Sequence, residues 1–283
     1  MKKICFVTTV YMTYKCFLKQ LSQYLYETGE YDISLICNNE EEALKDLPAF
    51  VHYHPVDMKR GVSLSAFSAI KKIGKILEKE KFDIVQYSTP NAAFYTSIAA
   101  KKKRVPVRLY CQWGIRYMGF EGWRRSLFKY LEKKTCDNST FIEVESHNIR
   151  NFSLQEKLYT TDRSCVIWNG SASGVDLNKF DITRKPYWRK KIRTILKLSD
   201  EDIIFAFAGR LTADKGVNEL LEAFLNIEKK YSYVKLLMMG GMDNHESLKQ
   251  ELWNQAKKST NIIFTGNVPN VEEYYAASDV FVA

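Results

Sequence analysis

The stretch that decides the fold is Ile203-Ile-Phe-Ala-Phe-Ala-Gly-Arg-Leu-Thr-Ala-Asp-Lys-Gly216. Its apolar run at 203–208 is typical of a parallel strand that is covered on both faces. Gly209 then permits a tight turn or the close approach of a ligand to the backbone. Arg210 and Lys215 follow at the mouth of a helix that we expect to begin near residue 215, and the amides and dipole of that helix also favour an anion. The stretch predicts a diphosphate site; the alternative is that both cations are ordinary solvated loop charges.

The same alternation of short apolar runs and longer amphipathic runs continues on both sides of this stretch. It predicts an α/β fold built on parallel sheets. Before residue 169 we expect strands at 3–9, 31–37, 51–53, 83–88, 107–111, 140–145 and 165–168, with helices at 64–80, 92–103, 119–136 and 147–159. After residue 200 we expect strands at 203–208, 233–239, 261–265 and from 280, with helices at 215–230, 246–258 and 271–277.

A junction between two domains is predicted in the middle of the chain. Residues 169–176 are small and turn-forming, and residues 181–197 are basic and mostly polar. We therefore expect a first domain over 1–168, an interdomain segment over 169–199 and a second domain over 200–283. Because the sequence stops inside an expected strand, we expect this second domain to be incomplete, either as a fragment of a longer protein or as a damaged version of one.

Composition limits the partners and the compartment. The chain has 42 Lys plus Arg against 33 Asp plus Glu, a formal charge of +9, which favours nucleotides, nucleic acid or acidic lipid surfaces as partners. Its 6 cysteines lack metal-ligand spacing and most lie in apolar runs, as expected for reduced thiols in the cytoplasm. No apolar run approaches the ~20 residues of a membrane-spanning helix, so any membrane contact would be peripheral, at the inner face.

Residues 210–216, followed by Val217, Leu220, Leu221, Ala223 and Phe224, resemble the donor-domain signature of family 4 glycosyltransferases. Those are retaining enzymes of the GT-B fold that use nucleotide-sugars. Further segments resemble the family in the same order, at 166–176, 236–241, 261–268 and 270–282. The resemblance implies two Rossmann-like domains that face each other across a cleft, with the acceptor on the first and the donor on the second.

The resemblance also implies roles on the donor side. It predicts transfer of a hexose or N-acetylhexosamine from a UDP-sugar to a lipid-linked or polysaccharide acceptor, as in capsule synthesis. Arg210 and Lys215 would neutralise the departing diphosphate, with no metal or other cofactor required. The backbone around Gly266, Asn267 and Val268 would read the uracil. Gly209 and the strand-end pair Gly240 and Gly241 lie beside the expected phosphate site. Relatives continue with a helix whose two glutamates grip the donor, beyond the last residue of this sequence.

Acceptor-side residues are expected at the strand ends of the first domain. Thr9 and Tyr11 occupy the first strand-to-helix turn, where the family usually opens its acceptor cleft. Gln112 follows a strand at a place where relatives commonly show a histidine nearby, and it has the chemistry to bind a sugar hydroxyl. Two roles are open for His147: it contacts the acceptor, or it caps a helix.

Carboxylates and histidines at other strand ends give weaker signals. Asp200 and Asp202 match a metal-binding pattern of another glycosyltransferase fold, but they precede a buried strand instead of following it. His52 and His54 share a strand face without an evident third ligand, so edge polarity is favoured over a metal site. Residues 143 and 145, both glutamates, share a face near the expected cleft, where a general base and solvated carboxylates are both open.

Residues 119–134 raise the question of a membrane surface. Phe120, Trp123, Leu127 and Leu131 recur at helical spacing, with Arg125, Lys129 and Lys133 on the far side. Such a helix is suited either to an anionic bilayer or to ordinary packing on its sheet. Residues 101–104 form a charged helix end, and no nucleic-acid motif accompanies them.

Two other functions stay open beside transfer. A GT-B nucleotide-sugar epimerase would need an acid and a base around the donor sugar, without an acceptor cleft. A noncatalytic remnant that binds nucleotide or a partner is the second alternative, since the two expected glutamates are absent and no histidine stands before Gly114.

Overall fold

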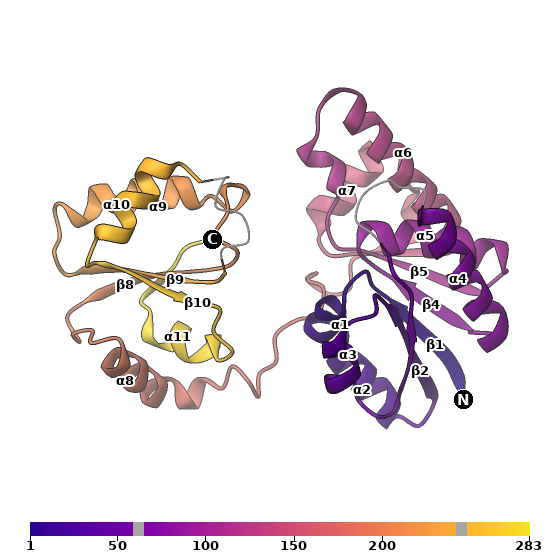
Figure 1. Cartoon of the computed structure of the whole chain (residues 1–283), viewed down its shortest axis with the longest axis horizontal. Helices are drawn as coiled ribbons and strands as arrows, with labels where there is room; N and C mark the ends of the chain where they lie inside the picture. The colour runs from indigo at the N-terminus through magenta and orange to yellow at the C-terminus, as the bar shows by residue number, and fades with distance from the viewer. Residues whose placement is uncertain (59–64, 242–247) are drawn as a thin grey trace. The chain divides into compact units, whose positions relative to one another are not determined.

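The computed structural model of the chain describes residues 1–58, 65–241 and 248–283. The chain divides into two compact units, Met1–Gly174 and Val175–Ala283 (Figure 1). Both units are parallel sheets covered by helices, which confirms the predicted α/β class. The first residue of the helix expected at 64–80 and the first two residues of the helix expected at 246–258 lie outside the described residues.

The first unit contains a seven-stranded parallel sheet in the order β3-β2-β1-β4-β5-β6-β7. Its strands are β1 (Lys2–Val7), β2 (Tyr31–Cys37), β3 (Val51–Pro55), β4 (Ile84–Tyr87), β5 (Val107–Gln112), β6 (Phe141–Val144) and β7 (Ser164–Cys165). The strand order reverses between β1 and β4. In open parallel sheets a crevice forms at the carboxyl ends of the strands at such a point.

Helices cover both faces of this sheet. They are α1 (Tyr11–Phe17), α2 (Lys19–Glu27), α3 (Glu41–Asp46), α4 (Ser65–Glu80), α5 (Pro90–Lys102), α6 (Gly122–Asn138) and α7 (His147–Gln155), with the short 3-10 helix η1 (Arg116–Gly119) before α6. Cys5 and Val7 of β1 join the core under α4, α5 and α6, while Ile4 and Phe6 join the core under α1, α2 and α3. Alternate residues of one buried strand thus supply both cores.

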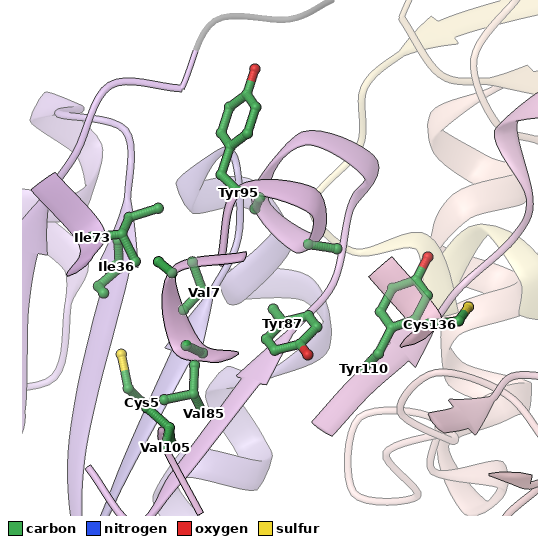
Figure 2. Packing of buried hydrophobic residues seen from close by; sticks show 14 of the residues in the cluster. Cys5, Val7, Ile36, Ile73, Val85, Tyr87, Tyr95, Val105, Tyr110 and Cys136 are labelled. Atoms are coloured by element: carbon green, nitrogen blue, oxygen red, sulfur yellow. The ribbon is translucent and has the colours of Figure 1, made fainter. Parts of the chain in front are cut away.

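Aromatic residues fill much of the core under α5 and α6. Figure 2 shows Tyr87 of β4 and Tyr110 of β5 close together, and their rings stack with centroids 6.0 Å apart. The hydroxyl of Tyr87 reaches the Ser139 hydroxyl at 2.7 Å, so the polar tip of this buried ring is satisfied.

The second unit has a four-stranded parallel sheet in the order β10-β9-β8-β11. Its strands are β8 (Ile203–Ala208), β9 (Val234–Met239), β10 (Ile262–Gly266) and β11 (Val280–Phe281). Its α-helices are α8 (Lys185–Ile195), α9 (Val217–Glu228), α10 (Gln250–Lys258) and α11 (Val271–Ala277). In Figure 1, α9 and α10 cover one face of this sheet and α8 and α11 the other.

Helix α8 lies within the basic, mostly polar stretch 181–197 that was expected to belong to the interdomain segment. Its sequence is rich in Lys and Arg, yet Trp188, Ile192 and Arg193 are buried inside the second unit. Arg193 donates to the carboxylate of Asp279 at 2.8 Å and to the carbonyl of Ala277 at 3.1 Å. A basic residue that is buried and paired reads as polar in the sequence but acts as part of the core.

Other boundaries differ by a few residues. The helix expected at 147–159 ends at Gln155, and the strand expected at 165–168 is the short β7. The helix expected from residue 215 begins at Val217, after a 3-10 turn over Ala213–Lys215. Within the described ranges, no helix combines the length and the apolar composition that crossing a bilayer requires.

Candidate functional site

The carboxyl end of β8 lies at the switch point of the second sheet. β8 pairs with β9 on one side and with β11 on the other, so the strand order reverses there. Ligands in open parallel sheets bind outside the carboxyl ends at this position. Gly209 and Arg210 follow β8 directly, which puts the predicted phosphate site at the crevice of this sheet.

Backbone hydrogen bonds join the strand ends around Gly209. The Gly209 amide donates to Met239 O at 2.9 Å, the Gly240 amide to Gly266 O at 2.8 Å and the Leu211 amide to Gly241 O at 3.0 Å. The ends of β8, β9 and β10 therefore form one continuous edge. This edge brings together the predicted Gly209, Gly240, Gly241 and Gly266.

Gly240 has a backbone conformation and an environment that only glycine fits. Its φ is +143°, and a Cβ at this position would lie 1.9 Å from the carbonyl oxygen of Gly209. Any side chain would force the β8 and β9 ends apart. The glycine pair seen in the sequence is thus required by the close approach of two backbones.

The loop after β10 completes this edge. Gly266 has φ of +67°, and a Cβ on Gly241 would come within 3.1 Å of the Asn267 side chain. Asn267 is exposed, while Val268 packs into the core on the α11 side of the sheet. The predicted uracil-reading segment therefore lies beside this edge of glycines, which we call the glycine edge. The packing of Val268 on the core anchors its loop.

The two predicted cations flank this edge and are both exposed. Arg210 Nη2 lies 3.3 Å from Asp214 Oδ2. In the part of the chain that the structure describes, the Lys215 ammonium has no carboxylate within ion-pair distance. The pKa of the Asp214 carboxyl is lowered, first by the neighbouring Thr212 and then by the charge of Arg210. Asp214 therefore provides a negative charge next to Arg210 and directly before Lys215 in the chain.

A left-handed turn at Gly216 separates Lys215 from α9. Gly216 has φ of +71° and is the N-cap residue of α9, so the first amides of the helix follow it directly. Because α9 follows a strand of a parallel sheet, its positive end lies at the carboxyl edge of that sheet. Arg210, Lys215 and the first turn of α9 can therefore act on one anion at this edge.

At the corresponding edge of the first unit, Thr9 contacts a residue that the sequence analysis missed. Thr9 Oγ1 and Thr89 Oγ1 are 2.8 Å apart, and the Thr9 amide donates to Thr89 Oγ1 at 3.2 Å. Thr89 follows β4 with a φ of +62°, rare for threonine. The pair links the ends of β1 and β4 at the switch point of the first sheet.

Tyr11 and Gln112 are placed inside the first unit, not on its surface. Tyr11 is fully buried, and its hydroxyl donates to Asp46 at 3.1 Å. Burial is the first cause that raises the pKa of its phenol. Both residues contribute to the interior, and neither offers its side chain to solvent.

Gln112 belongs to a buried polar network. Its Nε2 donates to Glu132 Oε1 at 2.6 Å, and its Oε1 accepts from Ser153 at 3.1 Å and from Tyr159 at 2.9 Å. The Tyr110 hydroxyl also donates to Glu132, at 2.8 Å. Burial raises the pKa of Glu132, although the hydrogen bonds from Gln112 and Tyr110 oppose this shift.

His147 is the first residue of α7 and is exposed. The hydroxyl of Ser146 caps this helix by accepting from the Ile149 amide at 3.3 Å. The capping role that was an alternative for His147 is therefore filled by its neighbour.

The other candidate groups separate into distinct environments. Glu143 and Glu145 lie at the end of β6, and burial raises the pKa of both. His52 lies 3.1 Å from Asp32, and burial lowers the pKa of His54. No group of three potential metal ligands occurs within the described ranges. The metal independence of the reaction stays a prediction.

The helix expected at 119–136 is α6, and the residues of its expected apolar stripe have different environments. Phe120 packs into the core, whereas Trp123 is 71% exposed. Arg125 and Lys129 both pair with Glu156 of the first unit, at 3.3 and 2.7 Å. The predicted apolar stripe is therefore divided between core and surface.

Comparison with known families agrees with this fold and edge. The profile described as glycosyl transferase 4-like matches residues 3–146, and the profile described as glycosyl transferases group 1 matches residues 189–283. The chain belongs to the family 4 glycosyltransferases. The resemblance inferred from the stretch after residue 203 is thereby confirmed.

Named relatives and solved structures extend this result. The chain is 27% identical over 232 residues to the capsular polysaccharide biosynthesis glycosyltransferase CapM of Staphylococcus aureus, covering 81% of this chain and 60% of CapM. It is 24% identical to an Escherichia coli UDP-Gal:alpha-D-GlcNAc-diphosphoundecaprenol alpha-1,3-galactosyltransferase, covering 89% of this chain and 65% of that enzyme. The chain thus spans less than two thirds of each relative.

The fold is shared with a crystal structure of Anabaena HepE in complex with UDP and glucose. The TM-score is 0.75 at 15% sequence identity, over 99% of this chain and 73% of HepE. This likeness confirms the GT-B fold predicted for this family member.

Proposed function

We propose that this family member transfers a sugar from a UDP-sugar to a lipid-linked or polysaccharide acceptor, with retention at the anomeric carbon. The observation that supports the proposal is the position of Arg210 and Lys215 between β8 and α9, at the switch point of the second sheet and beside the glycine edge. An anion at this place would meet two cations and the first amides of α9.

The donor is proposed to be a UDP-hexose or UDP-N-acetylhexosamine. HepE, which shares the fold, is described in complex with UDP and glucose, and the E. coli relative is named for a UDP-Gal donor. We assign the diphosphate to Arg210 and Lys215, and the uracil to the segment Gly266, Asn267 and Val268. Cleavage of the bond between sugar and diphosphate leaves negative charge on the diphosphate, which fixed cations stabilise most in the transition state. This charge stabilisation is proposed to work without a metal ion.

The acceptor is proposed to carry a lipid or to be a growing polysaccharide. The relatives' printed names support this class, since one is a capsular polysaccharide enzyme and the other acts on a diphosphoundecaprenol-linked sugar. Association with the inner face of the membrane follows as a further part of the proposal. The exposed Trp123 and Tyr130 of α6, with Arg124 and Lys134 above their rings, have the composition that an anionic bilayer attracts.

The test is an incubation of the purified chain with UDP-sugars labelled in the sugar, with and without an extracted lipid-linked glycan. We expect label to enter the organic phase only when acceptor is present, and the product to keep the anomeric configuration of the donor. The same incubation without the protein is the control for nonenzymatic transfer. Epimerisation of the donor without acceptor, or nucleotide binding without turnover in any combination, would contradict transfer.

A further inference from the structure

The first unit contains a pocket that the donor site does not use. It lies between α5 and α6, beneath η1, and its walls are largely apolar: Phe94, Tyr117, Phe128 and Leu131 contribute side chains, with Ala66 at one side. A pocket of this kind is suited to a hydrocarbon chain. Figure 2 shows Tyr95, another wall residue, with its hydroxyl directed away from the labelled core residues.

A second pocket adjoins the first and lies at the carboxyl edge of the sheet. It is lined by Thr89, Trp113 and Gly114 at the ends of β4 and β5, and both pockets share Pro90 and Arg116. Thr89 is the residue that contacts Thr9 at the switch point. One pocket therefore lies at the crevice of the first sheet and the other between helices, and we call the adjoining pair the groove.

Arg116 stands where the two pockets meet. Its guanidinium lies over the Phe128 ring at 4.7 Å and over the Phe120 ring at 6.0 Å, which holds an exposed side chain in place. Among residues 1–58, 65–241 and 248–283, no carboxylate lies within ion-pair distance of Arg116. The cation at this junction is thus available to an anionic ligand.

A buried carboxylate, Glu132, also lines the first pocket. Glu132 is 9% exposed, and its Oε1 accepts hydrogen bonds from Tyr110 and Gln112. Both donors thus engage the Glu132 carboxylate inside the unit. The cation available to a phosphate at the junction of the groove is the exposed Arg116.

We propose that this groove binds the acceptor lipid, with the hydrocarbon chain between α5 and α6 and its phosphate against Arg116. The inference rests on the proposed transfer to a lipid-linked acceptor and names the residues that would select it. A sugar attached to that phosphate would extend along the second pocket to Thr89 and Trp113, at the crevice of the first sheet. Free phosphate would satisfy only the cation and would leave the apolar pocket empty.

The experiment is a calorimetric titration of the chain with geranyl phosphate, geraniol and inorganic phosphate. We expect geranyl phosphate to bind more tightly than either of the other two probes. The Arg116→Ala variant should weaken geranyl phosphate binding by about tenfold to a hundredfold, because a charge-assisted hydrogen bond is lost. Arg104→Ala, at an exposed arginine that lines neither pocket, is the matched control and should bind as the wild type does.

A second pair of variants tests the apolar half of the groove. Ala66→Phe places a ring at the pocket wall and should weaken geranyl phosphate binding, whereas Phe67→Ala, at a 74% exposed neighbour, should not. Thermal unfolding is measured for every variant as the check on folding, and titration with UDP shows whether the donor site in the second unit is intact. If the wild type does not bind UDP, the proposed function is contradicted, but the proposed binding of lipid in the groove is not.

Three results would overturn the proposal that the groove binds the acceptor lipid. They are wild-type affinity for geranyl phosphate in Arg116→Ala, equal affinity of the wild type for geranyl phosphate and inorganic phosphate, and equal weakening by Ala66→Phe and Phe67→Ala.

Discussion

Arg210 is held by a partner that a diphosphate can replace. Its ion pair with Asp214 is on the surface, where both side chains are more than half exposed. Such pairs contribute about 0–1 kcal/mol, so little free energy is lost when the guanidinium turns to a ligand. Asp214 thus orients Arg210 in the absence of donor without blocking it.

Removal of either cation should affect turnover more than folding. We expect Arg210→Ala and Lys215→Ala each to lower turnover by roughly 10² to 10³, because fixed charge acts most on the leaving diphosphate in the transition state. The measurement is the transfer rate at saturating donor, with thermal unfolding as the check on folding. Lys229→Ala, at the opposite end of α9, is the control and should keep the wild-type rate.

Gly240 should be intolerant of any side chain. The Gly240→Ala variant would place its Cβ 1.9 Å from Gly209 O and would hold a non-glycine residue at φ of +143°. We expect the free energy of unfolding of the second unit to fall by about 1–3 kcal/mol or more from backbone strain alone. Denaturant titration measures it. At Gly209 the nearest atom to an added Cβ is a Phe207 ring carbon at 3.4 Å, so Gly209→Ala should unfold near the wild-type midpoint; equal destabilisation by both variants would contradict this account.

At this scale the sequence predicted the donor edge better than the acceptor side. Glycines and cations after an apolar strand have a local reason to be there, and Gly209, Arg210, Gly240 and Gly266 do lie along one edge. Whether a polar side chain is buried depends on packing from distant elements. Gln112 is a clear example, since its partners are 20, 41 and 47 positions away in the chain. Asp214 lies inside the decisive stretch, yet its pairing with Arg210 depends on the 3-10 turn that the helical pattern did not predict.

Among the elements, α8 is tied to the second sheet by a charged cluster. Asp279 accepts from Arg189 and Arg193 and also from the Ile204 amide, each at 2.8 Å. Arg193 is 2% exposed, so its removal leaves polar groups buried without their partner. The Arg193→Met variant should lose about 3 kcal/mol of stability, measured by denaturant unfolding of the second unit. Lys190→Met on the same helix is the control; an equal loss there would mean that the cluster is not the cause.

The same cluster predicts acid sensitivity. Burial opposes ionisation of Asp279, but the Ile204 amide and the two arginines outweigh it and hold the pKa of the carboxyl below 3.8. A folded-state pKa below the unfolded value contributes stability that is full above about pH 4 and is lost as the pH falls through the folded pKa. The free energy of unfolding of the second unit, measured between pH 6 and pH 2.5, should therefore fall more steeply with decreasing pH below pH 4. In Asp279→Asn this part of the pH dependence should vanish, and an unchanged profile would contradict the assignment.

Helix α6 offers the surface suited to a bilayer. Trp123, Leu127 and Tyr130 are 71%, 36% and 57% exposed, and Arg124 and Lys134 lie over two of these rings. We expect the chain to float with anionic vesicles more than with neutral ones, since each basic residue near such a surface adds about 1 kcal/mol. The double variant Trp123→Ser and Tyr130→Ser should reduce binding at least about tenfold by removing apolar burial. Tyr24→Ser, at an exposed tyrosine of α2, is the control, and equal binding by all three proteins would contradict a role for α6.

At the scale of the whole molecule, the alternation of strands and helices predicted the fold class and the positions of most strands. β2, β8 and α11 have the predicted bounds. Strand order did not follow from periodicity, because pairing of β1 with β4 and of β8 with β11 depends on crossovers between distant segments. The polar sequence of α8 likewise did not predict that the helix belongs to the second unit. Burial of Arg193 in this helix depends on Asp279, which is far along the chain.

The central claim is that the second unit binds the diphosphate of a UDP-sugar through Arg210 and Lys215. The most direct measurement is calorimetric titration of UDP and UMP into the wild type and into the Arg210→Ala, Lys215→Ala double variant. The wild type should bind UDP at least about tenfold more tightly than UMP, because only UDP offers a second phosphate to charge-assisted hydrogen bonds. The double variant should lose this difference and keep its affinity for UMP. Undiminished preference for UDP in the double variant would contradict the account.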